Sequence, residues 1–178
     1  MSNIIIYGSH YGTTKQYAEE LSKRTNIKVI SFKKVNQQID NYDNIIYLGG
    51  LYAGGVLGLS KTLKKVNKIS KKGIIIVTVG LSDPSDEVNK NNIRNSIKSQ
   101  IPKEIFDKAK IFHLRGGIDY SKLNFTHKTM MKLLYNAVKN LPEEKQTAED
   151  RAMIETYNKK VNFINYSSLD QIINVIQK

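Results

Sequence analysis

Cysteine is absent from this chain of 178 residues. Without thiols the chain cannot form disulfides, iron–sulfur clusters or zinc–thiolate sites. Histidine is also rare, since His10, His113 and His127 are the only three and lie far apart in the sequence. We therefore expect no metal site. If the protein performs redox chemistry, a bound organic cofactor must carry the electrons.

Long apolar runs are missing as well. No run approaches the ~20 residues that a membrane-spanning helix needs. The chain passes from Met1-Ser2-Asn3 straight into a strand-like run, without the basic and apolar segments of a leader peptide, so we expect a cytoplasmic location. Hydrophobic residues make up 40% of the sequence, which is enough for a sizeable core. We predict a single domain over residues 1–178, with no linker or repeat.

Acidic residues are few compared with basic ones. The 28 Lys and Arg residues exceed the 16 Asp and Glu residues by 12 formal charges. We interpret this excess mainly as lysine-rich, solvated helix faces. The alternative is attraction to an anionic membrane surface, an anionic substrate or partner, or nucleic acid. No aromatic and basic nucleic-acid motif is visible, so we do not expect nucleic acid to be a partner.

Five short apolar runs, rich in β-branched residues, recur along the chain. They lie at residues 4–7, 29–32, 45–48, 74–79 and 111–114. Most are continuous rather than alternating, which is typical of strands covered by helices on both faces. Amphipathic stretches separate most of them, and strand–helix alternation predicts a parallel sheet with right-handed crossovers. The fold class is therefore α/β.

The connections between the strands differ in character. Residues 33–43 are short and polar, which predicts an irregular crossover or one brief helix. After the fourth strand, Asp83 has the position of a helix N-cap, with Pro84 at the first helical position. Extra helical material follows the fifth strand at about residues 118–160. There an apolar stripe predicts one helix, formed by Met130, Met131, Leu134, Ala137, Val138 and Leu141. Thr147 and Asp150 have capping-box spacing for a second helix.

Ligands of parallel α/β sheets bind beyond the carboxyl ends of the strands. After the first strand come Ser9, His10, Tyr11, Gly12, Thr13 and Thr14. The hydroxyl groups of this segment and the N–H groups at the start of the next helix form a cradle for an anion. A plain helix N-terminus with incidental hydroxyls is the equally weighted alternative. The spacing of the glycines fits neither a nucleotide P-loop nor a dinucleotide fingerprint.

The loops after the third and fourth strands are rich in glycine. Residues 49–55 place Tyr52 among backbone-permissive neighbours, where a flat ring could stack on it. A packed tyrosine in a glycine-rich turn is the alternative. Gly80, Leu81 and Ser82 follow the fourth strand. Arg115 ends the fifth strand, and we interpret it as a structural ion-pair residue; contact with an anionic substrate is the alternative.

Together these loops resemble those of the flavodoxin-like family. The hydroxyl-rich segment at 9–14 is similar to the loop that binds the phosphate of FMN, and the next two loops match in position the pair that sandwich the isoalloxazine ring. The resemblance implies a three-layer fold with strand order 2-1-3-4-5 and non-covalently bound FMN. It also implies a flexible peptide near the flavin N5 atom, for which Gly54 is our candidate. The cofactor-binding residues that it implies are Ser9, His10, Tyr11, Gly12, Thr13, Thr14, Leu51, Tyr52, Ala53, Gly54, Gly80, Leu81 and Ser82.

Within that family, the insert at 118–160 and the basic charge resemble the branch that contains menaquinone-dependent protoporphyrinogen oxidase. The resemblance implies a redox protein that passes electrons through FMN, as a carrier or as an FMN-dependent oxidoreductase. Its partner would be a redox protein or a small anionic or quinone substrate, with peripheral contact to an anionic membrane as an option. A porphyrinogen- or quinone-type oxidoreductase and a flavin-free binding module with a basic surface are the alternatives. No side chain is assigned a catalytic role.

Overall fold

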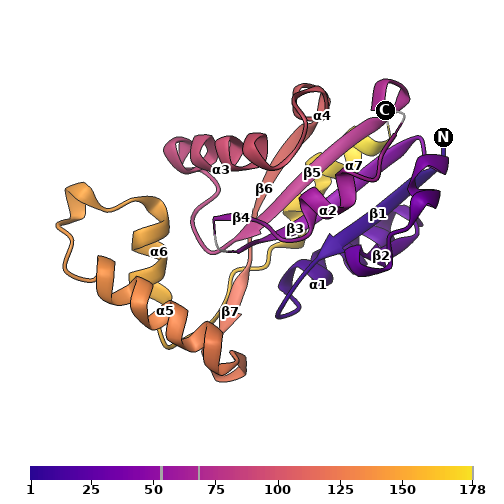
Figure 1. Ribbon diagram of the computed structural model, residues 1–178. Helices are drawn as coiled ribbons and strands as arrows, with labels where there is room; N and C mark the ends of the chain where they lie inside the picture. Colours follow the sequence, from indigo (N-terminus) through magenta and orange to yellow (C-terminus); the bar gives the residue numbers. More distant parts are fainter. Residues whose placement is uncertain (53, 68, 178) are drawn as a thin grey trace.

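Parallel strands form the centre of the protein in the computed structural model, which describes residues 1–52, 54–67 and 69–177. The five parallel strands are β1 (Asn3–Gly8), β2 (Val29–Ser31), β3 (Asn44–Tyr52), β5 (Gly73–Gly80) and β6 (Lys110–Arg115). Their order across the sheet is β2-β1-β3-β5-β6 (Figure 1). This is the predicted order 2-1-3-4-5, so the predicted fold class is confirmed. The short strand β4 (Gly55–Val56), which we did not predict, pairs antiparallel with the end of β3.

Helices cover both faces of this sheet because successive strand residues point to opposite sides. The side chains of Ile4 and Ile6 belong to one buried cluster, whereas Ile5 belongs to a second. Helices α2 (Leu59–Leu63), α3 (Glu87–Gln100) and α4 (Lys103–Lys108) close the first cluster. Helices α1 (Thr13–Thr25) and α7 (Asp170–Ile176) close the second. The continuous apolar runs in the sequence are therefore strands buried on both faces.

The helix after β5 begins three residues later than the sequence predicts. The side chain of Asp86, not Asp83, caps α3 by accepting a hydrogen bond of 2.8 Å from the backbone N–H of Asn89. Asp83 instead accepts hydrogen bonds from the backbone N–H and the hydroxyl of Ser85, at 2.8 and 2.7 Å. The prediction was wrong because an aspartate can stabilise a local turn as well as a helix start. After β2, the predicted brief, irregular crossover consists of two 3₁₀ turns, Phe32–Lys34 and Gln37–Asn41.

The segment after β6 is framed by a second, two-stranded ribbon. Strand β7 (Gly117–Asp119) pairs antiparallel with β8 (Lys160–Asn162), so the segment leaves and returns at one point. Between the two strands lie α5 (Phe125–Val138) and α6 (Ala148–Thr156). The predicted capping box of Thr147 and Asp150 is present at the start of α6. Figure 1 places α5 and α6 beyond the end of the sheet at which the parallel strands finish.

Helix α5 forms where its apolar stripe predicts a helix, but no residue of that stripe is fully buried. Met130, Met131, Val138 and Leu141 are partly buried, whereas Ala137 and Leu134 are exposed, the latter at 47%. The buried residue of α5 is instead His127. The aromatic rings of Tyr135 and Tyr157 stack at 3.9 Å between centroids and join α5 to α6. Among the described residues, no helix combines the length and the apolar character that crossing a membrane requires.

Gly8 lies where the backbone of another loop approaches the end of β1. A Cβ atom added at Gly8 would lie 2.1 Å from the carbonyl oxygen of Leu57 and 2.9 Å from the hydroxyl of Tyr47. We expect Gly8→Ala to lower the free energy of unfolding by about 2–3 kcal/mol, because backbone atoms must shift. Gly73→Ala is the matched control, since its Cβ would meet the tip of the Asn44 side chain. Urea unfolding should show the smaller loss for the control, and equal losses would contradict the prediction.

His113 on β6 predicts a loss of stability in mild acid. Its Nδ1 atom shares a hydrogen bond of 2.7 Å with the hydroxyl of Thr78. Burial first, and then the positive charges of Arg94 and Lys90, lower the pKa of His113 to about 4. The unfolded chain takes up this proton near pH ~6.5, so the free energy of unfolding should fall as the pH drops from there towards 4. His113→Gln should flatten this dependence in denaturant titrations at a series of pH values; an unchanged slope would refute the assignment.

Candidate functional site

The loops after three strands meet at one edge of the sheet. Strand β1 lies between β2 and β3. From β1 the chain first adds β2 on one side and then crosses back to add β3 on the other side, so the direction in which strands are added reverses at β1. This is the switch point at which open α/β sheets bind ligands. Gly8 pairs with Gly49, and Gly49 pairs with Thr78. The strands β1, β3 and β5 therefore end side by side. The loops that follow their carboxyl ends form the candidate site.

The loop after β1 presents neutral donors at the start of a long helix. Gly12 is the N-cap of α1 and has a φ of 96°, a backbone conformation that favours glycine. Its N–H donates a hydrogen bond of 3.0 Å to the hydroxyl of Ser9, which folds the loop. The hydroxyl of Thr13 donates to the carbonyl of Gly117 at 3.2 Å, and Thr14 is buried. No acidic residue lies in the first turn, so the helix dipole and its unpaired N–H groups favour an anion.

Four rings gather between this loop, the end of β3 and the start of α5. The ring centroid of Tyr52 lies 4.7 Å from that of His10 and 5.0 Å from that of His127. The Nε2 atom of His127 shares a hydrogen bond of 2.7 Å with the hydroxyl of Tyr52, and its Nδ1 atom shares another with the hydroxyl of Tyr11. Both nitrogens of one buried imidazole therefore connect the loop after β1 to the loop after β3. We name His10, Tyr11, Tyr52 and His127 the ring cluster.

The first turn of α5 is built to hold His127 in this position. The side chain of Asn124 caps the helix by accepting a hydrogen bond of 2.8 Å from the backbone N–H of His127. The backbone N–H of Asn124 donates to the hydroxyl of Tyr11 at 3.4 Å. Partial burial, the nearby His127 and the charge of Lys33 lower the pKa of His10. The ring cluster is thus an aromatic wall beside the anion-favouring loop.

His127 is the residue of this site that sequence reasoning missed. It is separated by 116 residues from Tyr11 and by 75 from Tyr52, and no motif links them. The structure brings the predicted residues of the first loop together with Tyr52. Of the other predicted residues of the second loop, Leu51 packs against the core and Ala53 lies outside the described residues. The carbonyl of Gly54 accepts a hydrogen bond from the hydroxyl of Ser96 on α3.

The third loop turns its polar groups towards the protein. The carbonyl of Gly80 accepts a hydrogen bond of 2.6 Å from the N–H of Gly116, and that of Leu81 accepts one of 2.8 Å from Arg115. Ser82 is buried, and its hydroxyl accepts a hydrogen bond of 3.0 Å from the side-chain amide of Asn89. Its hydroxyl is therefore used inside the fold. Arg115 has the structural role that the sequence predicts, with Glu155 as its ion-pair partner at 3.5 Å.

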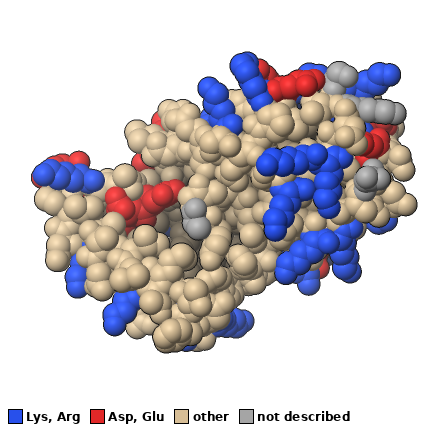
Figure 2. Space-filling model, in the orientation of Figure 1, with Lys and Arg blue, Asp and Glu red and all other residues tan. Residues whose placement is uncertain are grey.

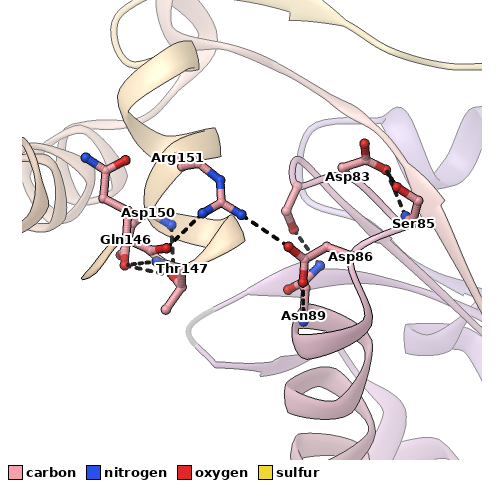
Figure 3. Close-up of polar contacts among 9 residues, drawn as sticks. Asp83, Ser85, Asp86, Asn89, Gln146, Thr147, Asp150 and Arg151 are labelled. Carbon is pink, nitrogen blue, oxygen red and sulfur yellow. Dashed lines mark hydrogen bonds and ion pairs between the residues drawn. The ribbon is translucent and has the colours of Figure 1, made fainter. Parts of the chain in front are cut away.

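The insert also contacts the start of α3, the helix that follows this third loop. Figure 3 shows Arg151 of α6 between two groups: it donates to the carbonyl of Gln146 at 2.8 Å and forms an ion pair of 3.1 Å with Asp86. Asp86 also caps α3, so a single carboxylate joins the insert to the helix that follows β5. Arg151 and His127 hold α6 and α5 against different loops of the site. The insert is therefore a part of the site's frame.

Comparisons with known proteins identify the family of the chain. The family described as "Flavodoxin domain" matches residues 4–146. No curated protein sequence matches. Among solved structures, the chain is similar to a Lactobacillus acidophilus flavoprotein in complex with FMN, with 13% identity, a TM-score of 0.43, and coverage of 64% of this chain and 92% of that one.

Two flavodoxins are similar to a comparable degree. The Fusobacterium nucleatum flavodoxin bound to flavin mononucleotide has 16% identity and a TM-score of 0.41, with coverage of 70% of this chain and 75% of that one. The oxidised Flavodoxin 1 from Bacillus cereus has 14% identity and a TM-score of 0.38, with coverage of 80% and 100%. These likenesses concern the fold. Because the family match spans most of the sequence, this chain belongs to the flavodoxin domain family.

Proposed function

We propose that the protein binds FMN non-covalently at the loops after β1, β3 and β5 and passes electrons through it. The observation that carries this proposal is the loop after β1, which offers neutral donors to an anion at the switch point of the sheet. Membership of the flavodoxin domain family supports it independently. When bound, FMN supplies the capacity to accept and release electrons, which the side chains of this chain lack.

The residues of the phosphate end fit a dianionic group. A Cβ atom placed on Gly12 would meet no atom within 4 Å, so the loop has open space at the helix start. The N–H groups of the first turn of α1, at Thr13 and Thr14, have no acceptor within the helix and are free to bind phosphate oxygens. Ser9 shapes the loop by accepting the N–H of Gly12. A neutral cradle of this kind holds the phosphate without an ion pair.

The ring end requires a rearrangement of the ring cluster. Tyr52 is the aromatic surface against which the flavin ring stacks, yet in this structure its ring already contacts His10. His10 is exposed, whereas His127 is 9% exposed and bonded through both nitrogens. His10 would therefore have to move to admit a flavin ring, and His127 would keep Tyr52 in place. Leu51 and Gly54 flank Tyr52, with Gly80, Leu81 and Ser82 across the site.

Gly54 is our candidate for the flexible peptide near the flavin that the family resemblance implies. Its φ of 75° is accessible to glycine at little cost. The hydroxyl of Ser96 on α3 holds the carbonyl of Gly54 in one orientation. A reversal of this peptide breaks that hydrogen bond, so α3 restrains the motion. The proposal requires no side chain to act as an acid or a base, and its electron acceptor or donor is a redox partner protein.

The resemblance of the insert to that of menaquinone-dependent protoporphyrinogen oxidase stays a prediction. Residues 118–160 are part of the frame of the site, which is compatible with an enzyme as well as with a carrier. We therefore propose no substrate. An electron carrier and an FMN-dependent oxidoreductase share the cofactor site described above, and both are tested by the same flavin-binding experiments.

Ser9→Asp tests the phosphate end, because aspartate can still accept the N–H of Gly12 while it adds a negative charge. We expect the Kd for FMN to rise about 100-fold, which corresponds to about 2.7 kcal/mol of like-charge repulsion. The Kd for riboflavin, which has no phosphate, should change less than about threefold. Fluorescence titration of both flavins measures this. An equal loss of affinity for the two flavins would place the phosphate elsewhere.

Tyr52→Ala tests the ring end and should affect both flavins equally. Loss of the aromatic surface removes ring stacking worth about 1.4 kcal/mol, so the affinities for FMN and riboflavin should both fall about tenfold. Tyr52→Phe is the control, because it keeps the ring and loses only the hydrogen bond to His127. If Tyr52→Ala leaves the riboflavin affinity unchanged, Tyr52 does not contact the flavin ring.

A further inference from the structure

One surface of the protein carries an excess of positive charge, although Asp40, whose carboxylate accepts two hydrogen bonds from Asn67, lies in sequence between its two basic elements. Between Asp43 and Asp83 the sequence contains no acidic residue at all. Two short elements expose lysines here: the 3₁₀ turn Phe32–Lys34, and the end of α2 with the residues after it. We name this surface the lysine face; its members are Lys33, Lys34, Lys61, Lys64 and Lys65.

These lysines are not neutralised within the fold. Lys33, Lys34, Lys61 and Lys64 are exposed, and none of the four forms an ion pair within residues 1–52, 54–67 and 69–177. Lys65 donates its ammonium group to the carbonyl of Val35 at 2.6 Å, which ties α2 to the segment after β2. Figure 2 shows blue side chains gathered over the region of α2 and β1, with little red among them. The charge is therefore available to a partner.

The lysine face borders the proposed cofactor site. The carbonyl of Leu57, two residues before α2, lies against Gly8 at the start of the first loop. The ring of Phe32 lies beside Gly58, so the 3₁₀ turn and the start of α2 meet there. The positive charge of Lys33 also contributes to lowering the pKa of His10 in the ring cluster. A partner seated on the lysine face would lie next to the end of the molecule at which FMN is proposed to bind.

We propose that the lysine face is the docking surface for a partner protein whose own contact surface is acidic. Complementary charges of this kind steer association and fix orientation. The identity of this partner as a redox protein rests on the proposed function, whereas the docking surface itself does not.

Two other anionic partners fit this surface less well. Peripheral membrane binding is favoured by apolar side chains among the charges, yet none of the exposed large hydrophobic residues of the described chain belongs to the lysine face, and the exposed Tyr11 is bound within the neighbouring ring cluster. Binding of single-stranded nucleic acid uses exposed aromatic side chains for base stacking, and the lysine face has none. A protein surface that carries several carboxylates needs neither feature.

Two triple variants with the same change in net charge test the proposal. K33E/K61E/K64E reverses three charges of the lysine face. K23E/K28E/K110E reverses three charges at the opposite end of the sheet, since Lys28 and Lys110 lie where β2 and β6 begin and Lys23 lies in the last turn of α1. The probe is the acidic haem domain of cytochrome b5, with the basic cytochrome c as the control protein. Thermal unfolding confirms that each variant folds.

Binding is measured at low ionic strength by surface plasmon resonance, on both the flavin-free and the FMN-loaded protein. We expect the parent to bind the acidic probe, the lysine-face variant to bind at least about tenfold more weakly, and the control variant to bind within about twofold of the parent. Equal losses in the two variants would overturn the proposal, because net charge alone would then explain binding. So would a lysine-face variant that binds the probe normally but no longer binds phosphatidylserine vesicles or an oligonucleotide.

The affinity for FMN is titrated separately, so a protein that binds the probe but not FMN would refute the proposed function and leave the docking surface intact.

Discussion

The parallel pairing of β1 with both β2 and β3 is the constraint on which the rest of the site depends. It places β1 at the point where the connections of the sheet diverge, and its register brings Gly8 level with Gly49. Loops that are distant in sequence then leave the sheet at one edge. The start of α1 and the end of β3 face each other only because these strands end together. The basic 3₁₀ turn after β2 reaches the same edge for the same reason.

Much of this arrangement could be predicted from the sequence because the central strands are buried on both faces. Continuous runs of isoleucine and valine identify such strands, and in a parallel sheet the residues after each strand must share one edge. Local polar chemistry was harder to predict. Asp83 and Asp86 both resemble helix caps, and the choice between them depends on Ser85 and on the ion pair with Arg151. The three-residue strand β7 is too short to leave a pattern, since its pairing with β8 stabilises it.

The ring cluster was not predictable, because its central residue lies in a different part of the chain. His127 belongs to a helix whose apolar stripe predicts burial for leucines and methionines. In the structure Leu134 of this stripe stays exposed, and the histidine is buried against Tyr11 and Tyr52. No periodicity rule selects a histidine over a leucine as the contact residue. His127 is the contact residue because two tyrosine hydroxyls provide a hydrogen-bond partner for each nitrogen of its imidazole.

The separation of His127 from its partners has a consequence for how the molecule assembles. Contacts across 116 and 75 residues close large loops, which costs chain entropy that only a formed sheet can offset. The strands and the helices that cover them must therefore be in place before α5 can reach the ring cluster. During synthesis, the loops after β1 and β3 leave the ribosome long before His127 does. The ring cluster therefore depends on long-range contacts made by the insert, and detachment of the insert removes those contacts from Tyr11 and Tyr52.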